Sequence, residues 1–521
     1  MIYRCADAEV EIPVTDVTSF VLESAAERGD KPALIDGPSG RVVTFAELER
    51  GIRALAAGLA EHGFGKDDTL AVFMPNVPEY AILFHGAASA GGRCTTANPL
   101  YTAHELAHQL TDSGARMLVT VPPFLETARE AAEEAGIGDQ VFVLGEGEGA
   151  TPFAELLGDP DSAPEPEIDP MTDLAVIPYS SGTTGLPKGV MLSHHNLVSN
   201  LCQMQASLSI GDADTLIGCL PFFHIYGMTV IMNQGLRNGA TIVTMPRFDL
   251  EQFLALLEEH GVTRTYVVPP IAVALAKHPA IDDCDLSSVR TIMSGAAPLG
   301  AELAERVAAR LDCDVIQGYG MTETSPVTHV IRPENNKPGS IGPAIPNTEC
   351  RLVDPETGED VGEGERGELW VRGPQVMQGY LNNDEATAHT VDSDGWLHTG
   401  DIAVIDSDGF FEIVDRLKEL IKYKGFQVAP AELEALIQTH PAVADVAVGG
   451  IPDEDCGELP KAYVVPASDE FDSEELMEWV AGQVSPQKKI RLVETLDEIP
   501  KSPSGKILRR VLKDRERAAS S

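Results

Sequence analysis

One segment of the chain has the composition of a phosphate-binding loop. Residues 179–189, YSSGTTGLPKG, contain three glycines, four Ser and Thr hydroxyls and one lysine, Lys188. Glycines let the backbone approach an anion closely, while amide, hydroxyl and ammonium groups surround its oxygens. A flexible surface loop rich in Ser and Gly is the alternative for this segment taken alone. The Walker pattern is absent, because Pro187 precedes the lysine and Gly189 follows it where that motif needs glycine and a hydroxyl. A P-loop NTPase is therefore disfavoured.

A second segment, residues 317–323 (QGYGMTE), combines a ring with groups that suit phosphate and Mg²⁺. The small residues leave room for a flat ligand ring, and Tyr319 offers a face on which it can stack. Thr322 adds a hydroxyl and Glu323 a carboxylate, which is a ligand that Mg²⁺ accepts. The alternative is a glycine-rich turn with an incidental acid.

Other polar side chains lie in segments with two interpretations each. His224 and Tyr226 belong to the aromatic segment 221–227, where a buried structural histidine is the alternative to a site. Asp401 ends the segment WLHTGD, and a carboxylate there can accept ribose hydroxyls or cap a turn. Lysine is rare, with 14 in the chain, and six of them lie in such segments: Lys188, Lys418, Lys422, Lys424, Lys501 and Lys506. This clustering favours a functional use.

The elements that must position these residues follow from periodicity. Between Val43 and about Thr120, helically spaced apolar residues alternate with short apolar runs, which predicts β and α elements in layers. After the glycine-rich loop we expect a strand at 188–192, an N-cap at Ser193 and a helix over 194–207. Short strands with turn signals are predicted over 350–415, including a hairpin turn at 406–409.

The length of 521 residues exceeds what a single hydrophobic core supports, so at least two domains are expected. The segment 145–171 is acidic and rich in Pro and Gly, which predicts an internal boundary of the first domain near 158–171. A compact final unit is expected from about residue 416, with a helix over 431–438 and strands over 443–448 and 462–465.

The charge is unusual, since 81 acidic residues face 38 basic ones and give a net charge of −43. The acids are spread along the chain, which indicates an acidic folded surface and a halophilic setting. Such a surface repels nucleic acid and anionic membranes. The eight cysteines show no metal-ligand spacing, and no apolar run of about 18 residues is present. We therefore expect an intracellular, cytoplasmic protein without an integral membrane segment.

Seven segments occur in the order typical of one family: 179–189, 221–227, 294–298, 317–323, 399–401, 415–427 and 500–506. With them the chain resembles the adenylate-forming superfamily over essentially its whole length. It looks most like its AMP-forming acyl-CoA synthetases, the branch of 4-coumarate–CoA ligases, fatty acyl-CoA ligases and luciferase-like enzymes.

The resemblance implies an α/β fold with a large N-terminal domain, 1–415, built from layered α/β subdomains and a small β-barrel-like one. A small mobile α+β domain, 416–521, would follow a hinge near Lys418. The implied reaction uses Mg²⁺, ATP and CoA: a carboxylic acid becomes acyl-AMP with release of pyrophosphate, and CoA then displaces AMP. Transfer of the acyl group to a carrier protein, or nucleotide binding without turnover, are the alternatives. The implied state is a monomer or homodimer.

The resemblance also assigns residues. Lys506, Thr322, Glu323 and His224 would be catalytic, with Glu323 as the Mg²⁺ ligand. The nucleotide would contact Ser180, Ser181, Gly182, Thr183, Thr184, Lys188, Ala296, Gln317, Gly318, Tyr319, Thr322, Asp401, Arg416 and Lys506. The acyl pocket would use His224, Tyr226, Val230, Met293 and Gly295, and the CoA step Arg247, Lys418, Lys422, Lys424, Gly425 and Gln427.

One position departs from the pattern of hydroxycinnamate-specific relatives. Many of those carry lysine immediately before the SGAAP segment, where this chain has Met293. This favours an apolar acyl chain, from a medium-chain or longer fatty acid, or a plain aryl acid as substrate.

Overall fold

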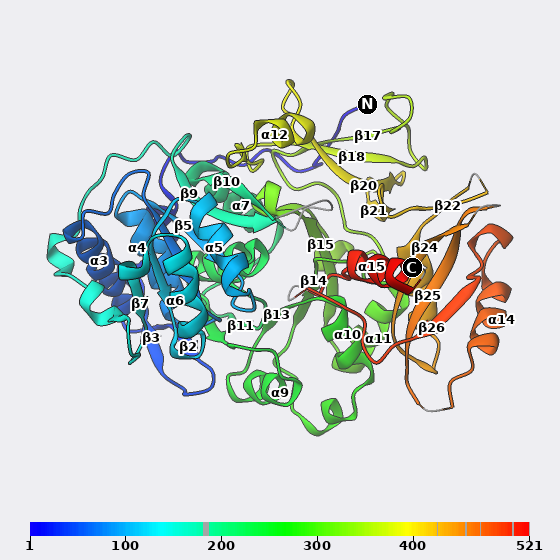
Figure 1. The fold of residues 1–521 in the computed structure, drawn as a ribbon, viewed down its shortest axis with the longest axis horizontal. Helices are drawn as coiled ribbons and strands as arrows, with labels where there is room; N and C mark the ends of the chain where they lie inside the picture. The colour runs from blue at the N-terminus through cyan, green and yellow to red at the C-terminus, as the bar shows by residue number, and fades with distance from the viewer. Residues whose placement is uncertain (181–186, 425, 454–455, 469, 503–504, 520–521) are drawn as a thin grey trace.

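The computed structural model describes residues 1–180, 187–424, 426–453, 456–468, 470–502 and 505–519. Four β-sheets organise these residues, and helices cover them (Figure 1). The predicted loop residues Ser181, Gly182, Thr183 and Thr184, and also Gly425, lie outside the described ranges.

The sheet that carries the glycine-rich loop has eight strands, mostly parallel and buried on both faces. Its order is β19 (Gly379–Tyr380), β10 (Lys188–Ser193), β9 (Leu174–Ser180), β5 (Arg93–Ala97), β4 (Thr69–Phe73), β6 (Ala115–Thr120), β7 (Val141–Val143) and β8 (Thr151–Pro152). Leu70 and Val72 of β4 pack with α3 (Phe45–Glu61) and α4 (Glu79–Ser89). Ala71 and Phe73 face α5 (Ala103–Asp112) and α6 (Leu125–Glu134) on the other side. Successive residues of the apolar strand β4 thus point to opposite faces of the sheet and pack into two separate cores.

A second eight-stranded sheet carries the other N-terminal motifs. Its order is β16 (Val327–Val330), β15 (Asp314–Gly320), β14 (Thr291–Ser294), β13 (Arg264–Val267), β11 (Thr215–Gly218), β12 (Thr241–Thr244), β2 (Pro32–Asp36) and β3 (Val42–Thr44). The strands from β15 to β2 are parallel. The helices in this part of the chain are α1 (Val17–Val21), α2 (Ala25–Arg28), α7 (His194–Ser207), a π-helix (Tyr226–Asn233), α8 (Gln234–Asn238), α9 (Leu250–Glu259), α10 (Pro269–Lys277) and α11 (Ala301–Leu311).

A five-stranded antiparallel sheet follows in the order β1 (Tyr3–Arg4), β17 (Glu349–Val353), β18 (Gly367–Arg372), β20 (Leu397–Ile405) and β21 (Phe411–Arg416). α12 (Asp384–Thr390) precedes β20. The predicted turn at 406–409 joins β20 to β21, and this register sets Asp401 opposite Arg416. Short 3-10 turns occupy Pro122–Phe124, Gly138–Gln140, Phe153–Leu156, Pro160–Ser162, Pro279–Asp283, Thr322–Thr324, Pro333–Asn335 and Pro486–Lys488.

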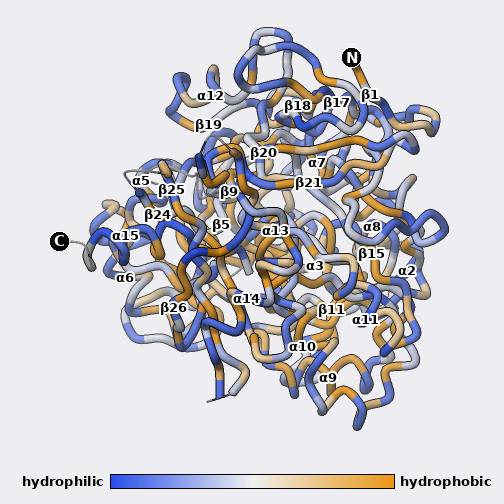
Figure 2. The backbone as a smooth tube through the Cα atoms, turned by 90° about the vertical axis from the view of Figure 1, so that its right-hand side faces the viewer, coloured by the Kyte–Doolittle hydropathy of each residue, from blue (hydrophilic) through white to orange (hydrophobic). Residues whose placement is uncertain are grey.

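The last unit is built on β23 (Phe426–Val428), β22 (Ile421–Tyr423), β25 (Gly457–Pro466), β24 (Val443–Asp453) and β26 (Leu492–Thr495). α13 (Pro430–Gln438) and α14 (Ser473–Gln483) pack on an apolar core of this sheet. α15 (Arg509–Ala519) lies beside β24 and is largely hydrophilic (Figure 2). Figure 1 shows this unit at one end of the molecule, in orange and red.

Most predicted elements are confirmed. Ser193 caps α7 through a capping box with Asn196, and the helix spans the predicted 194–207. α13 starts one residue earlier than predicted, at Pro430, and β24 and β25 extend beyond the predicted strands. The segment 145–171 connects strands of the same sheet. The domain limits at 158–171 and 415/416 stay predictions.

All eight cysteines are free thiols. Within the described residues, no helix has the length and apolarity that crossing a membrane requires.

Candidate active site

The two ends of the glycine-rich loop meet at the edge of the first sheet. Ser180 ends β9 and Lys188 begins β10, and these residues are register partners in an antiparallel pair. The Lys188 ammonium lies 4.7 Å from the centre of the Tyr380 ring, a cation–π contact. The loop ends therefore present a hydroxyl and a positive charge on one side of the sheet.

Glu323 is the buried carboxylate beside this loop, with 6% of its surface exposed. Its Oε1 accepts hydrogen bonds from the Ser180 hydroxyl at 3.0 Å and the Tyr380 hydroxyl at 2.8 Å. Burial raises the pKa of Tyr380, with the charge of Glu323 adding to it, so the phenol stays protonated. Tyr380 was not predicted as a site residue, because no pattern around it distinguishes it from a core tyrosine.

The donor set around Glu323 fits Mg²⁺ held mainly by a substrate. Mg²⁺ is usually bound through one or two carboxylates together with substrate phosphates and water. Within the described ranges, no group of three or more His, Cys, Asp or Glu could hold a metal by itself. One carboxylate next to a phosphate-type loop is the arrangement expected for a metal that arrives with a nucleotide.

Tyr319, Asp401 and Arg416 converge from three strands on one point. The Tyr319 hydroxyl donates to Asp401 Oδ2 at 2.5 Å, and Arg416 Nε lies 3.2 Å from Asp401 Oδ1. Asp401 is 4% exposed, and its backbone N–H donates to Thr399 Oγ1 at 3.0 Å. Burial raises the pKa of Tyr319, and Asp401 raises it further. The carboxylate is thus oriented by one hydrogen bond and one ion pair and retains lone pairs for a diol.

Gln317 holds the segment around Ala296, which is predicted to contact the nucleotide. Its side-chain oxygen accepts the backbone N–H of Leu299 at 2.9 Å. Ala296, within the segment so held, has a left-handed φ of 69°. The Gln317 Nε2 and Ser294 Oγ atoms are buried and have no hydrogen-bond partner within the described part of the chain. Within the described residues, both groups therefore keep an unused hydrogen-bonding capacity.

The predicted acyl-pocket residues pack against one another. The Tyr226 hydroxyl donates to the Met293 carbonyl at 3.2 Å, and the Tyr226 ring lies beside Gly295, where an added Cβ would come within 3.0 Å of it. A Cβ at Gly318 would lie 2.2 Å from the Met293 Cε methyl. Val230 is buried in the same π-helix as Tyr226. The absence of a side chain at these two glycines thus lets the Tyr226 ring and the Met293 thioether pack directly against the backbone.

His224 lies next to Tyr226, and its ring is neutral. Burial lowers the pKa of His224 to about 4, and the nearby Lys506 charge contributes. Its Nδ1 accepts the backbone N–H of Tyr226 at 3.3 Å, which leaves the proton of the neutral ring on Nε2.

Lys506 comes from the far end of the chain into the same site. Burial lowers the pKa of Lys506 to about 8 and Arg416 lowers it further, while Asp401, Glu419 and Glu323 oppose the shift. Its neighbour Gly505 packs closely on the N-terminal part, since a Cβ there would lie 2.8 Å from Val268 Cγ2. The structure therefore brings Lys506 together with the predicted nucleotide-binding residues.

The residues predicted for the CoA step are placed differently. Lys422, Lys424 and Gln427 are exposed on the β22–β23 hairpin, next to Phe426, which is 54% exposed. Arg247 is exposed in the loop after β12. Lys418 lies between β21 and β22. Each of these side chains is exposed, whereas Lys506 is half-buried among charged groups of the site.

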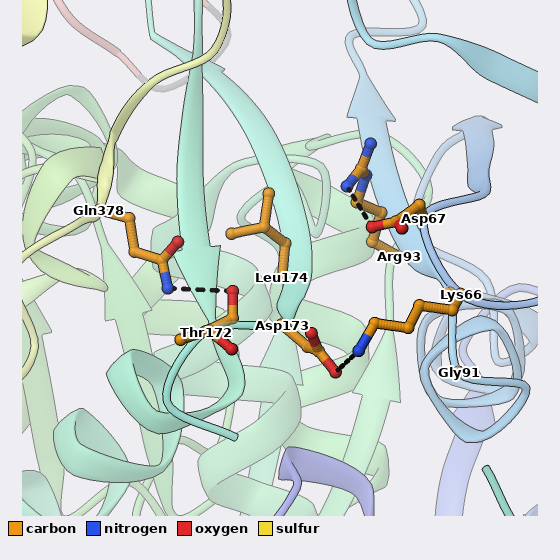
Figure 3. Close-up of a pocket in the computed structure, with 9 residues that line it drawn as sticks. Lys66, Asp67, Gly91, Arg93, Thr172, Asp173, Leu174 and Gln378 are labelled. Carbon is orange, nitrogen blue, oxygen red and sulfur yellow. Dashed lines mark hydrogen bonds and ion pairs between the residues drawn. The ribbon is translucent and has the colours of Figure 1, made fainter. Parts of the chain in front are cut away.

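A polar cavity of about 220 Å³ lies elsewhere, at the amino ends of β4, β5 and β9 (Figure 3). Its charged groups are paired: Lys66 with Asp173 at 3.0 Å and Arg93 with Asp67 at 3.9 Å. The glycine-rich loop follows the carboxyl end of β9, so this cavity is separate from the site described above.

Comparison with known proteins agrees with this geometry. The family described as AMP-binding enzyme matches residues 21–381, and the AMP-binding enzyme C-terminal domain matches residues 432–506. The chain is 44% identical over 523 residues to 4-coumarate–CoA ligase 3 of Oryza sativa, covering 98% of this chain and 94% of that one. It is 44% identical over 534 residues to 4-coumarate–CoA ligase 1 of Solanum tuberosum, covering 100% and 98%.

Solved structures give the same result. ATP-bound MatB from Rhodopseudomonas palustris superposes with a TM-score of 0.87 at 31% identity, over 96% of this chain and 99% of that one. The anthranilate CoA ligase AuaEII, in complex with anthranoyl-AMP, gives 0.90 at 25% identity, over 98% and 99%. With these matches over its whole length, the chain belongs to the AMP-binding enzyme family of the adenylate-forming superfamily and is an AMP-forming acid–thiol ligase.

Proposed function

We propose that the enzyme activates an aryl or arylpropenoic acid with MgATP and transfers the acyl group to CoA. The observation that carries the proposal is the convergence of Lys506 with Asp401, Arg416 and Glu323. A carboxylate and a triphosphate repel each other, so their reaction needs fixed positive charge where negative charge develops. Lys506 is the group placed to supply it.

In the first step, a carboxylate oxygen of the acid attacks the α-phosphorus, and the bond to the β-phosphate breaks to release pyrophosphate. Lys506 would contact both the attacking carboxylate and the α-phosphate, and Thr322 would donate to the latter. Lys188 and Ser180, with the loop between them, would hold the β- and γ-phosphates. Mg²⁺ on Glu323 would neutralise phosphate charge. In the second step, the CoA sulfur attacks the acyl carbonyl and AMP leaves.

The nucleoside would lie between Tyr319 and the Ala296 segment. The ribose hydroxyls would donate to Asp401, whose orientation is fixed by Tyr319 and Arg416. Gln317 Nε2 is buried and has no hydrogen-bond partner among the described residues, and a buried donor in this state costs about 1–3 kcal/mol of free energy. This supports the proposal that a polar ligand binds here.

The pocket favours a flat apolar acyl group. Tyr226 packs on Gly295 and Met293 packs on Gly318, and the Tyr226 hydroxyl is already hydrogen-bonded to the Met293 carbonyl. The relatives named above are ligases of 4-coumarate, and the structural neighbour AuaEII is a ligase of anthranilate, both aryl acids. Met293 and Val230 offer no polar partner for a ring hydroxyl. We therefore infer an aryl or arylpropenoic acid with an apolar far end.

ATP–pyrophosphate exchange with a panel of acids tests this function. Cinnamate and benzoate should support exchange, 4-coumarate should be weaker, and straight-chain acids of six to twelve carbons weakest. A maximum on the straight-chain acids would overturn the aryl assignment, and a maximum on 4-coumarate would overturn the role given to Met293. Absence of exchange with every acid would overturn adenylation itself. Product analysis with CoA separates thioester formation from transfer to a carrier protein.

A further inference from the structure

Arg509, three residues after Lys506, binds three elements of the last unit at once. Its Nη2 lies 2.7 Å from both carboxylate oxygens of Glu434 on α13. Its Nη1 donates to Glu419 at 2.7 Å, and its Nε donates to the carbonyl of Val448 on β24 at 3.2 Å. Every nitrogen of the guanidinium is therefore used, in a geometry that the planar fork of arginine suits and a lysine does not reproduce.

These contacts fix the end of the loop that carries Lys506. Arg509 is the first residue of α15, and the preceding residue, Leu508, donates its N–H to the Pro500 carbonyl at 2.8 Å. Within the loop, the Ser502 hydroxyl accepts the Lys506 N–H at 3.1 Å. The loop is closed at its base by backbone bonds, and the base is held to Glu434 and Glu419 by Arg509.

The same guanidinium faces a buried carboxylate on the other side of the predicted hinge. Asp415, in β21, accepts the backbone N–H of Arg416 at 2.6 Å and that of Ala431, at the start of α13, at 2.9 Å. Asp415 is register partner of Ile402, one residue from the Asp401–Arg416 pair. The charged groups that act on Asp415 are Arg509 and Glu434, and burial raises its pKa to about 7. Asp415 thus links the nucleotide site to the unit that carries Lys506.

We propose that Arg509 is a positioning residue for adenylate formation, which holds Lys506 at the Asp401–Arg416 pair. It does so by joining Glu419 and Glu434 to the start of α15, opposite Asp415. The inference rests on the proposed function, since it gives Lys506 its role in the first step. Arg509 touches no reacting atom and acts through Lys506. The effects of mutating Arg509 and Lys506 should therefore be coupled in adenylate formation and independent in thioester formation.

A double-mutant cycle with the full-length enzyme tests this coupling. Arg509→Lys should slow single-turnover acyl-AMP formation by about 10²-fold, the loss expected for a displacement near 1 Å. Thioester formation from supplied acyl-AMP and CoA should stay within about threefold of the wild type, because it does not use Lys506. In a Lys506→Ala background, Arg509→Lys should cost no more than about a further twofold, since the group that it positions is already absent.

Two variants complete the design. Arg510→Lys is the matched control, because the Arg510 side chain is 74% exposed and should leave both half-reactions unchanged. If Arg509→Lys does not unfold in a cooperative thermal transition, Glu434→Gln replaces it. This variant weakens the same contacts with little change of side-chain shape, and the same double-mutant cycle with Lys506→Ala then tests the coupling. Equal losses in both half-reactions, or the same loss with and without Lys506, would overturn the positioning role. Absence of exchange in the wild type would instead reject the proposed function.

Discussion

The Tyr319 hydroxyl and the Asp401 carboxylate are joined by a hydrogen bond of 2.5 Å across 82 residues of sequence. Arg416 holds the other oxygen of the same carboxylate. A carboxylate with a hydrogen bond on one oxygen and an ion pair on the other cannot rotate freely, so its remaining lone pairs point in fixed directions. In the proposed binding mode, this residue pair would provide both the plane for a base and the acceptor for a ribose, because Tyr319 also offers its ring.

Lys506→Ala separates the two half-reactions. The variant loses the charge shared by the attacking carboxylate and the α-phosphate, so acyl-AMP formation should fall by about 10²–10³-fold, as for loss of one preorganised donor. Thioester formation from supplied acyl-AMP should largely survive. Single-turnover measurement of each step checks this, and a change of only a few-fold in both steps would remove the catalytic role given to Lys506.

The pH dependence of the first step reports the same group. Burial lowers the pKa of Lys506 to about 8, so the ammonium is present below that pH and is lost as the pH rises through it. The kcat/KM for adenylate formation, which reports the free enzyme, should fall about tenfold per pH unit above pH 8. Lys506→Arg should shift this decline in kcat/KM to higher pH, because a guanidinium stays charged. A profile level to pH 10 contradicts the assignment.

His224 should not add a second limb to that profile. Burial lowers the pKa of His224 to about 4, so its ring is neutral throughout the range from pH 5 to 8. A limb near pH 6.5 that disappears in His224→Gln would show that the ring titrates near its ordinary value.

Much of this arrangement could be predicted from local sequence. The capping box of Ser193 and the turn at 406–409 depend on neighbouring residues, so α7 and the β20–β21 hairpin were predicted correctly. The contacts of Glu323 with Tyr380, and of Arg509 with Glu434, join residues more than fifty positions apart. No spacing rule predicts such pairs, because tertiary packing alone brings them together.

Glu323→Gln tests the proposed metal site. The amide keeps the shape of the side chain and an oxygen for the Ser180 and Tyr380 hydroxyls but removes the negative charge that would attract Mg²⁺. The Mg²⁺ concentration for half-maximal pyrophosphate exchange should rise at least about tenfold. Tyr380→Phe is the control, since it removes one hydrogen bond and keeps the charge, and its Mg²⁺ requirement should rise less. An equal rise in both variants would place the metal elsewhere.

Lys422→Ala should impair the other half-reaction. Lys422 is exposed on the β22–β23 hairpin in the structure that has Lys506 at the site, which agrees with use of the hairpin in a different orientation of the last unit. Acyl-AMP should form at the wild-type rate and accumulate, while CoA transfer slows. Lys418→Pro, which fixes φ at the predicted hinge, should act in the same direction. Equal loss of both steps in both variants would reject a rotating domain.

The predicted halophilic setting is tested by the salt dependence of stability. A net charge of −43 on 521 residues produces self-repulsion, which destabilises the compact state in dilute buffer. Added salt screens that repulsion, with a Debye length of about 30 Å at 0.01 M and about 3 Å at 1 M. The thermal midpoint should therefore rise steeply between low and molar KCl. Sucrose at equal water activity is the control, because a non-ionic osmolyte does not screen charge and should raise the midpoint much less. A midpoint independent of KCl would remove the halophilic assignment and leave the acid–thiol ligase chemistry as it stands.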